Sequence, residues 1–212
     1  FAEKPQSPAP IPGNPSHTLA SMGIYIAKLD YLKGHLRADA EDTGSSHDFG
    51  RDIIPKILNG GDHVEAHQFV SPLQDREPYW RDVGTIDAFY NANLELISPQ
   101  PPMDIYDQTW PTLTYQPQLP PAHFVEGGTN KWVSNSMVSG GCVVVDSCLE
   151  NSILFSNVKV QKGCVLDGVL ALPGCEIGPG SRIKNAILDN QCQIPAGTVI
   201  GESPDLDAKQ YP

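Results

Sequence analysis

The sequence predicts an α/β domain followed by a parallel β-helix, and three observations carry this prediction. Strand-like and helix-like segments alternate over residues 1–97, which favours an α/β layer with a largely parallel sheet. Residues 98–125 contain seven prolines and no hydrophobic periodicity, so we expect an extended connector there. Residues 126–212 contain a short motif that recurs every 16 to 18 positions, which is typical of the coils of a β-helix.

Two segments of the first region are expected as strands. LASMGIYIAKL, residues 19–29, is apolar and β-branched enough for a buried strand. HVEAHQFV, residues 63–70, is a shorter strand-like segment. Both would belong to the predicted sheet.

Three segments are expected as helices. Residues 30–38 place two leucines one helical turn apart, and residues 49–61 place four aliphatic side chains on one face before a Gly-Gly pair. The third helix follows Thr85, a suitable N-cap, and Asp87 suits the positive end of that helix. Its apolar residues recur at helical spacing and are Ile86, Phe89, Leu94 and Ile97.

The repeats of the last region have two regular features. The repeated four-residue motif begins at Asn135, Asn151, Asp167 and Asn185. Small or aliphatic residues step by six, in the runs Cys142, Cys148, Leu154, Val160, Leu166 and Leu172, then Ile177 and Ile183, then Ile194 and Ile200. In a parallel β-helix one such side chain per face points inward, and Gly, Asn or Asp occupies corners where φ is positive. About four coils are therefore expected over residues 133–201.

Composition limits the class of protein. The net charge of −11 argues against nucleic acid or an anionic membrane as the main partner, and no apolar run approaches the ~20 residues of a membrane span. The five cysteines form no C-x-x-C pair, so we expect reduced, buried thiols in a cytoplasmic protein. The chain has no initiator Met, and FAEKP resembles the end of a strand already under way. We therefore interpret the chain as a fragment.

The histidines do not favour a catalytic or zinc site. His63 and His67 are four residues apart, but the intervening glutamate matches neither metalloprotease order and the segment is strand-like. Hexapeptide-repeat acyltransferases draw a histidine base from their coils, whereas all six histidines here lie at or before His123. The β-helix is therefore expected to be a structural, oligomerisation or regulatory module.

Two short motifs carry more chemistry. Glu3 can accept hydrogen bonds from sugar hydroxyls, and Lys4 can bring a point charge to a phosphate, although a surface Glu-Lys pair is the alternative. Asp82 could hold Mg²⁺ through a carboxylate oxygen, with phosphates and water completing the shell. The alternative for Asp82 is a helix cap, or an ion pair with Arg81.

The order of these motifs resembles that of the ADP-glucose pyrophosphorylase (glucose-1-phosphate adenylyltransferase) family of bacteria. The resemblance covers nearly the whole chain and rests on EKP, LASMGIY, SSHDFG, YWRDVGT, MVSGGCV and IPAGTVIG. It implies a partial nucleotidyltransferase domain with a Rossmann-like fold, followed by a left-handed β-helix. EKP and W-x-D-x-G-T alone would indicate only the broader sugar-nucleotidyltransferase superfamily.

The resemblance also implies roles for individual residues. Glu3 would hold glucose hydroxyls and Lys4 the sugar phosphate, and Asp82 would be one of two aspartates that hold the catalytic Mg²⁺. Catalysis would rest on Asp82 and Lys4. The remaining residues that line the glucose 1-phosphate pocket would be Ser21, Tyr25, Asp48, Phe49 and Trp80.

The activity that the resemblance implies is the synthesis of ADP-glucose and pyrophosphate from ATP and glucose 1-phosphate for glycogen. The family's Gly-rich phosphate loop, essential arginine and second metal aspartate are absent, so this chain alone is expected to be inactive. The family's β-helix implies a homotetramer controlled by small-molecule effectors. Two alternatives stay open: a nucleotidyltransferase that uses UTP or dTTP, and a non-catalytic regulatory paralogue.

Overall fold

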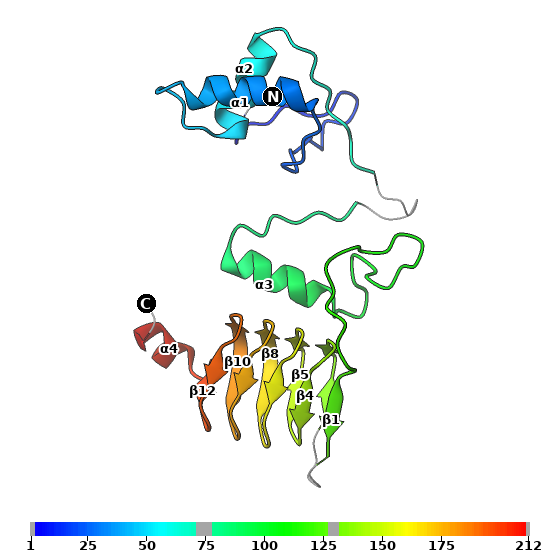
Figure 1. The fold of residues 1–212 in the computed structure, drawn as a ribbon, viewed down its shortest axis with the longest axis vertical. Coiled ribbons are helices and arrows are strands. Elements are labelled where there is room, and N and C mark those ends of the chain that lie inside the picture. The colour runs from blue at the N-terminus through cyan, green and yellow to red at the C-terminus, as the bar shows by residue number, and fades with distance from the viewer. Residues whose placement is uncertain (1–2, 71–77, 127–131, 211–212) are drawn as a thin grey trace. The chain divides into compact units, whose positions relative to one another are not determined.

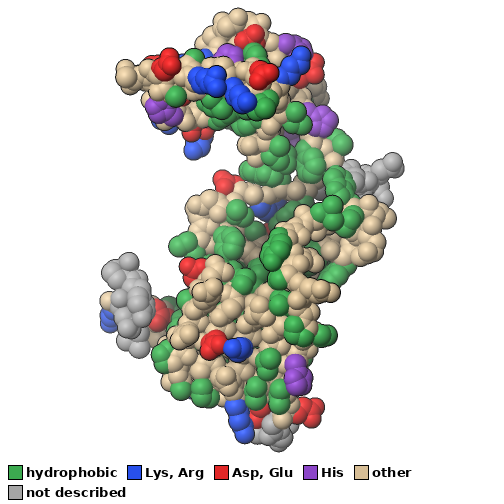
Figure 2. Space-filling model, viewed as in Figure 1, with side chains coloured by type: hydrophobic (Ala, Val, Ile, Leu, Met, Phe, Trp, Pro, Cys, Tyr) green, Lys and Arg blue, Asp and Glu red, His purple; other side chains and the backbone are tan. Residues whose placement is uncertain are grey.

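The computed structural model describes residues 3–70, 78–126 and 132–210, which fall into two compact units, residues 1–80 and 81–212 (Figure 1). The buried hydrophobic residues of the first unit lie on its short helices, whereas those of the second fill the β-helix. Both units carry hydrophobic side chains on their surfaces (Figure 2), among them Ile24 and Ile26 in the first and Trp110 and Tyr115 in the second.

The first unit is built from helix α1 (Leu29–Ala40), a π-helical turn η1 (Phe49–Ile53) and helix α2 (Ile54–Asn59). Both expected helices are confirmed. The side chain of Asp48 caps η1 by accepting a hydrogen bond from the backbone N–H of Arg51 at 2.7 Å. Three isoleucines of the expected apolar face are buried: Ile53, Ile54 and Ile57.

The prediction of two strands in this unit is wrong. Residues 19–29 contain no strand, and Ile24 and Ile26 within them are 72% and 100% exposed. Residues 63–70 also contain no strand. A strand needs a neighbour that pairs with its N–H and C=O groups. Among the described residues of this unit, the only β-type pairing is the isolated bridge between Ile11 and Asn14, so these segments have no strand to join.

The second unit begins with the expected helix, α3 (Ile86–Glu95). Thr85 is its N-cap, as predicted, because its Oγ1 accepts a hydrogen bond from the backbone N–H of Ala88 at 3.1 Å. Asp87 lies in the first turn, where the helix dipole favours a negative charge. The helix packs against strand β8 (Val165–Ala171) of the β-helix (Figure 1).

The parallel β-helix is confirmed. Its named strands pair only in parallel. One sheet has the order β1-β4-β7-β9-β11, and the other has the order β12-β10-β8-β5-β2, with β6 between β3 and β8. Figure 1 shows the coils side by side, from β1 at one end to β12 at the other. The last described element is helix α4 (Pro204–Gln210). The strands are β1 (His123–Val125), β2 (Val133–Ser134), β3 (Met137–Val138), β4 (Val143–Val145), β5 (Cys148–Glu150), β6 (Ile153–Leu154), β7 (Lys159–Val160), β8 (Val165–Ala171), β9 (Glu176–Ile177), β10 (Arg182–Leu188), β11 (Gln193–Ile194) and β12 (Val199–Ile200).

The register corrects one predicted repeat. Ser134 pairs with Glu150, Glu150 with Asp167, and Asp167 with Lys184, so successive coils contain 16, 17 and 17 residues. The next position of each coil is the corner, and the residues there are Asn135, Asn151, Gly168 and Asn185, all with positive φ. The repeat expected to begin at Asp167 therefore has its corner one residue later, at Gly168.

Most of the six-residue stepping is confirmed. Five residues of the first run are at most 5% exposed: Cys142, Cys148, Leu154, Val160 and Leu166. Leu172 is only half-buried. The coil contains 17 residues and not 18, so Ala171, which pairs with Leu154, takes the inward position instead. Ile177 and Ile183 are buried, whereas Ile194 and Ile200 of the last coil pack against the core with partial exposure.

Candidate active site

Three of the residues expected around a sugar phosphate lie together in the first unit. The Tyr25 ring stacks on the Phe49 ring with centroids 5.0 Å apart and an interplanar angle of 18°. Ser21 Oγ lies 3.0 Å from Tyr25 OH and accepts a hydrogen bond from the Gly23 backbone N–H. The turn at Gly23, with φ of +71°, thereby joins Ser21 to an aromatic face.

Glu3 joins the same neighbourhood through Gly50. A Cβ atom on Gly50 would clash with Oε2 of Glu3, and it would lie 3.5 Å from Oδ1 of Asp48. The carboxylates of Glu3 and Asp48 therefore both face a glycine that has no room for a side chain. Two carboxylates beside stacked aromatic rings form a surface that can accept hydrogen bonds from hydroxyl groups.

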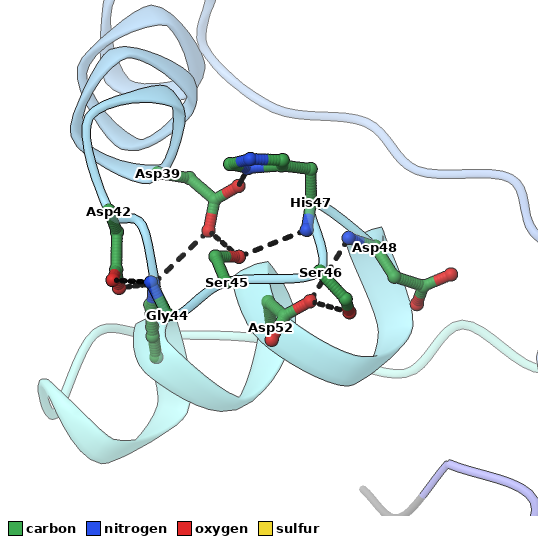
Figure 3. A network of polar contacts seen from close by, with 9 residues as sticks. Asp39, Asp42, Gly44, Ser45, Ser46, His47, Asp48 and Asp52 are labelled. Atoms are coloured by element: carbon green, nitrogen blue, oxygen red, sulfur yellow. Dashed lines mark hydrogen bonds and ion pairs between the residues drawn. The ribbon is translucent and has the colours of Figure 1, made fainter.

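A polar network behind this surface fixes the loop that carries Asp48 (Figure 3). Its centre is Asp39, whose side chain is 5% exposed. Asp39 Oδ1 accepts hydrogen bonds from Ser45 Oγ at 2.7 Å and Lys56 Nζ at 3.1 Å, and Oδ2 bonds to His47 Nδ1 at 2.9 Å. The hydrogen bond from Ser45, followed by those from His47 and Lys56, lowers the Asp39 pKa to about 2.

Other acids of the network hold the flanks of the loop. Asp42 accepts hydrogen bonds from Lys56 Nζ at 2.7 Å and from the Gly44 backbone N–H at 2.9 Å, which lower its pKa. Asp52 Oδ2 accepts from Ser46 Oγ and from the Asp48 backbone N–H, and its pKa is lowered too. The loop is thus held at both sides of Asp48.

These supporting residues could not be predicted from the sequence. Asp39 and Lys56 are 17 positions apart on different helices, and no local pattern links them. The nearest signal is the density of Asp, Ser and His between α1 and η1, since such residues compete for backbone groups in tight loops.

Two further expected residues, Lys4 and Trp80, belong to the same unit. Lys4 is exposed and adopts φ of 44°, a left-handed conformation that is uncommon for a residue with a Cβ. Trp80 is 40% exposed and is the last residue of the unit. Both side chains are therefore accessible to a ligand.

Asp82 falls in the second unit, three residues before the N-cap of α3. Its Oδ1 accepts a hydrogen bond from the Gly84 backbone N–H at 2.9 Å, which closes a tight turn. Arg81 pairs with Glu95 instead, with Nε 3.2 Å from Oε2. Asp82 is exposed. A single oriented carboxylate fits Mg²⁺, which is often held by one or two carboxylates together with substrate phosphates and water.

His63, one of the two histidines that are four residues apart, lies beside a glutamate. His63 Nε2 lies 3.0 Å from Glu65 Oε1, and both side chains are more than 80% exposed. Among the described residues, no group of three or more His, Cys, Asp and Glu side chains is arranged to hold a metal ion. None of the described helices is long and apolar enough to cross a membrane. The cysteines are free thiols, as expected; four are buried and Cys192 is partly exposed.

Comparison with known proteins relates both parts of the chain to families. Residues 1–98 match the family described as nucleotidyl transferase, and residues 120–212 match the family described as GlmU-like, C-terminal hexapeptide. The chain is therefore similar to a class of protein in which a nucleotidyl transferase domain is followed by a hexapeptide β-helix, and this predicted order of domains is confirmed.

Within this class, the chain is similar along its whole length to glucose-1-phosphate adenylyltransferases. It is 48% identical, over all of its residues, to the enzymes of that name from Yersinia pseudotuberculosis serotype O:1b and Yersinia pestis strain Pestoides F. The aligned part is 50% of the first relative and 45% of the second. The chain thus spans about half the length of the curated relatives it matches.

Proposed function

We propose that the whole protein containing this chain transfers AMP from ATP to glucose 1-phosphate, producing ADP-glucose and pyrophosphate for glycogen synthesis. This proposal rests on one observation: the carboxylates of Glu3 and Asp48 lie close together at Gly50, next to the stacked rings of Tyr25 and Phe49. The name shared by relatives that are 48% identical over the whole chain supports it. This chain would supply the sugar-phosphate side of the site.

The proposed roles follow from the chemistry of each group. Glu3 and Asp48 accept hydrogen bonds from glucose hydroxyls, and the Tyr25–Phe49 stack packs against the apolar face of the sugar ring. Lys4 seats the phosphate as a point charge and positions the attacking oxygen without acting as a base. Ser21 and Trp80 are the remaining proposed contacts of glucose 1-phosphate.

Asp82 is the proposed ligand of the catalytic Mg²⁺. The hydrogen bond from the Gly84 N–H to Oδ1 orients the carboxylate and leaves it exposed to solvent. When bound, the metal would neutralise charge that develops on the phosphates, which is typically worth several kcal/mol of transition-state stabilisation.

We further propose a cytoplasmic homotetramer regulated by small molecules. Five free thiols fit a reducing compartment. The last coil leaves Val199 53% exposed and Ile194 partly exposed, an apolar end that a second subunit could cover. Light scattering that finds a monomeric full-length protein would contradict the tetramer.

No effector site is assigned, because each described Lys or Arg side chain of the coils has a carboxylate partner. The pairs are Lys159–Glu176, Lys162–Asp146, Arg182–Glu202 and Lys184–Asp167.

The activity is tested by pyrophosphate release from the full-length protein. Glucose 1-phosphate is supplied with ATP, UTP or dTTP in turn, with Mg²⁺ present. We expect the highest kcat/KM with ATP. A higher value with UTP or dTTP would assign a different nucleotidyltransferase, and no release with any nucleotide would favour the regulatory paralogue.

A further inference from the structure

A short hydrogen bond joins helix α3 to the β-helix. Tyr90 OH donates to the backbone C=O of Gly168 at 2.6 Å, across 78 positions of sequence. Tyr90 is partly buried, and its pKa is raised by that burial and by the nearby charge of Asp167. The phenol therefore stays protonated at physiological pH and remains a donor.

The acceptor lies at a corner that is shaped for this contact. Gly168 has φ of +64°, and a Cβ atom there would come within 2.8 Å of Tyr90 OH. The same corner is occupied by Asn135, Asn151 and Asn185 in the other coils, so an asparagine tolerates this backbone conformation. Among these four described corners, only the one that faces Tyr90 has glycine. This departure from the repeat makes room for the tyrosine hydroxyl.

Helix α3 also connects Tyr90 to the turn that contains Asp82, just before the helix begins. Asp82 Oδ1 accepts from the Gly84 N–H at 2.9 Å, and Thr85 then caps α3 through the Ala88 N–H. The ion pair of Arg81 with Glu95 closes the segment onto the far end of the helix. Tyr90 lies five residues after Thr85, about 7.5 Å along the helix axis at 1.5 Å per residue. Hydrogen bonds and one rigid helix thus join Asp82 to Gly168.

We propose that Tyr90 is a positioning residue that uses the Gly168 corner of the β-helix to hold Asp82 in place for its metal. This inference rests on the proposed function, because Asp82 matters to catalysis only if it binds Mg²⁺. The alternative is a role in packing alone. Removal of the hydroxyl distinguishes the two roles: packing affects unfolding, whereas positioning affects the turn at Asp82 and the Mg²⁺ dependence of the rate.

The test uses the full-length protein and four variants: Tyr90→Phe, Gly168→Ala, the double variant, and Tyr106→Phe as a control. Tyr106 is 71% exposed and lies outside both the site and the contact. Three quantities are measured: kcat and KM for glucose 1-phosphate, the Mg²⁺ concentration that gives half-maximal rate, and amide hydrogen exchange of the Gly84 and Ala88 N–H groups. Thermal melting establishes that each variant is folded.

For Tyr90→Phe we expect kcat to fall about tenfold, within the ~100-fold that a displacement of about 1 Å can cause. The Mg²⁺ requirement should rise, KM for glucose 1-phosphate should change little, and the two amides should exchange faster. Gly168→Ala should have similar effects, because its methyl group displaces the tyrosine. The double variant should lose less than the product of the two single losses, since a phenylalanine side chain lacks the displaced oxygen. Crowding against Asn185 is common to both backgrounds and cancels in this comparison.

Several outcomes would overturn the proposal. A folded Tyr90→Phe protein with unchanged Mg²⁺ dependence and unchanged exchange would leave only packing. Independent, multiplicative losses in the double variant would show that the two positions do not act together. If the wild-type protein has no activity, the proposed function fails instead, and the exchange of the Gly84 amide still decides whether Tyr90 holds the turn.

Discussion

The carboxylate of Asp39 and the imidazole of His47 are joined by a hydrogen bond of 2.9 Å between Oδ2 and Nδ1. This contact helps to hold His47 at φ of 59°, a left-handed conformation that disfavours residues with a Cβ. Figure 3 shows the His47 ring directed to Asp39, while the carboxylate of Asp48 points away from it. Asp39, a buried acid, thus fixes the position of the loop residue next to Asp48 and with it the direction of the Asp48 carboxylate.

The first prediction concerns Asp39. Asp39→Asn should raise KM for glucose 1-phosphate roughly tenfold, the order expected when a charge-assisted hydrogen bond is weakened, with a smaller change in kcat. The physical reason is a looser loop at Asp48 and Phe49. Asp30→Asn is the matched control, because Asp30 is an exposed acid on the same helix. Steady-state kinetics of the full-length protein measure both, and equal KM values would contradict the positioning role.

The second prediction is a pH dependence of stability. The pKa of Asp39 is about 2 in the folded protein, below its ordinary 3.8, so the ionised form favours folding. This contribution is fully present above the unfolded pKa and is lost as pH falls from about 3.8 to about 2. The difference in Tm between wild type and Asp39→Asn should therefore be constant from pH 7 to about 5 and shrink below about pH 4. A difference that grows on acidification has the wrong sign.

The third prediction separates metal and phosphate roles. Asp82→Asn should lower kcat about 100-fold or more, because several kcal/mol of stabilisation by the metal corresponds to such a factor. Lys4→Ala should mainly raise KM for glucose 1-phosphate, since it removes a contact made before and during reaction. Asp87→Asn, another exposed acid beside the same turn, is the control for Asp82. Wild-type turnover by Asp82→Asn would remove the metal from this position.

The fourth prediction concerns thiol reactivity. Burial raises the pKa of Cys142 and of Cys175, so these thiols are protonated and shielded from reagents. Cys192 is the one cysteine of the chain with partial exposure. Brief alkylation of the native protein, followed by peptide mapping, should modify Cys192 first and the other four only in denaturant. Equal labelling of Cys142 and Cys192 in the native protein would mean that the coils open readily.

The sequence was sufficient where local chemistry decides the structure. Thr85 caps α3 because its hydroxyl is three residues from a free helix N–H, and that spacing is visible in the sequence. The segment around Ile24 has the composition of a strand, yet strand formation depends on a partner elsewhere in the chain. Composition therefore predicted a strand over residues 19–29, but no described strand of this unit is available to pair with it.

The candidate site likewise contains residues that the sequence motifs indicate and contacts that they do not. The resemblance to a known family singled out Glu3, Asp48 and Phe49, and their role in binding a sugar phosphate stays a prediction. The parts that sequence did not reveal are distant contacts: Asp39 to Lys56, and Tyr90 to Gly168. Both depend on how separate elements pack, and no spacing rule encodes that packing.

The corners of the β-helix give a last prediction that separates backbone strain from crowding. Gly141 has φ of +75°, and an added Cβ atom would clash with Oδ1 of Asn157 on the next coil. Gly180 has a similar φ of +72°, but nothing lies within 4 Å of the same added atom. Gly180→Ala should therefore destabilise the β-helix only by the strain of left-handed backbone, about 1 to 2 kcal/mol.

Gly141→Ala should carry the same strain plus the effect of overpacking, a further contribution of about 1 to 3 kcal/mol. Urea unfolding of the two variants measures the difference in their free energies of unfolding. Asn157→Gly in the Gly141→Ala background removes the obstructing carboxamide, is compatible with the φ of 61° at position 157, and should recover part of the loss. Equal destabilisation of the two glycine variants would mean that the coils relax around the methyl group, and that the glycine at this corner is required only by its φ.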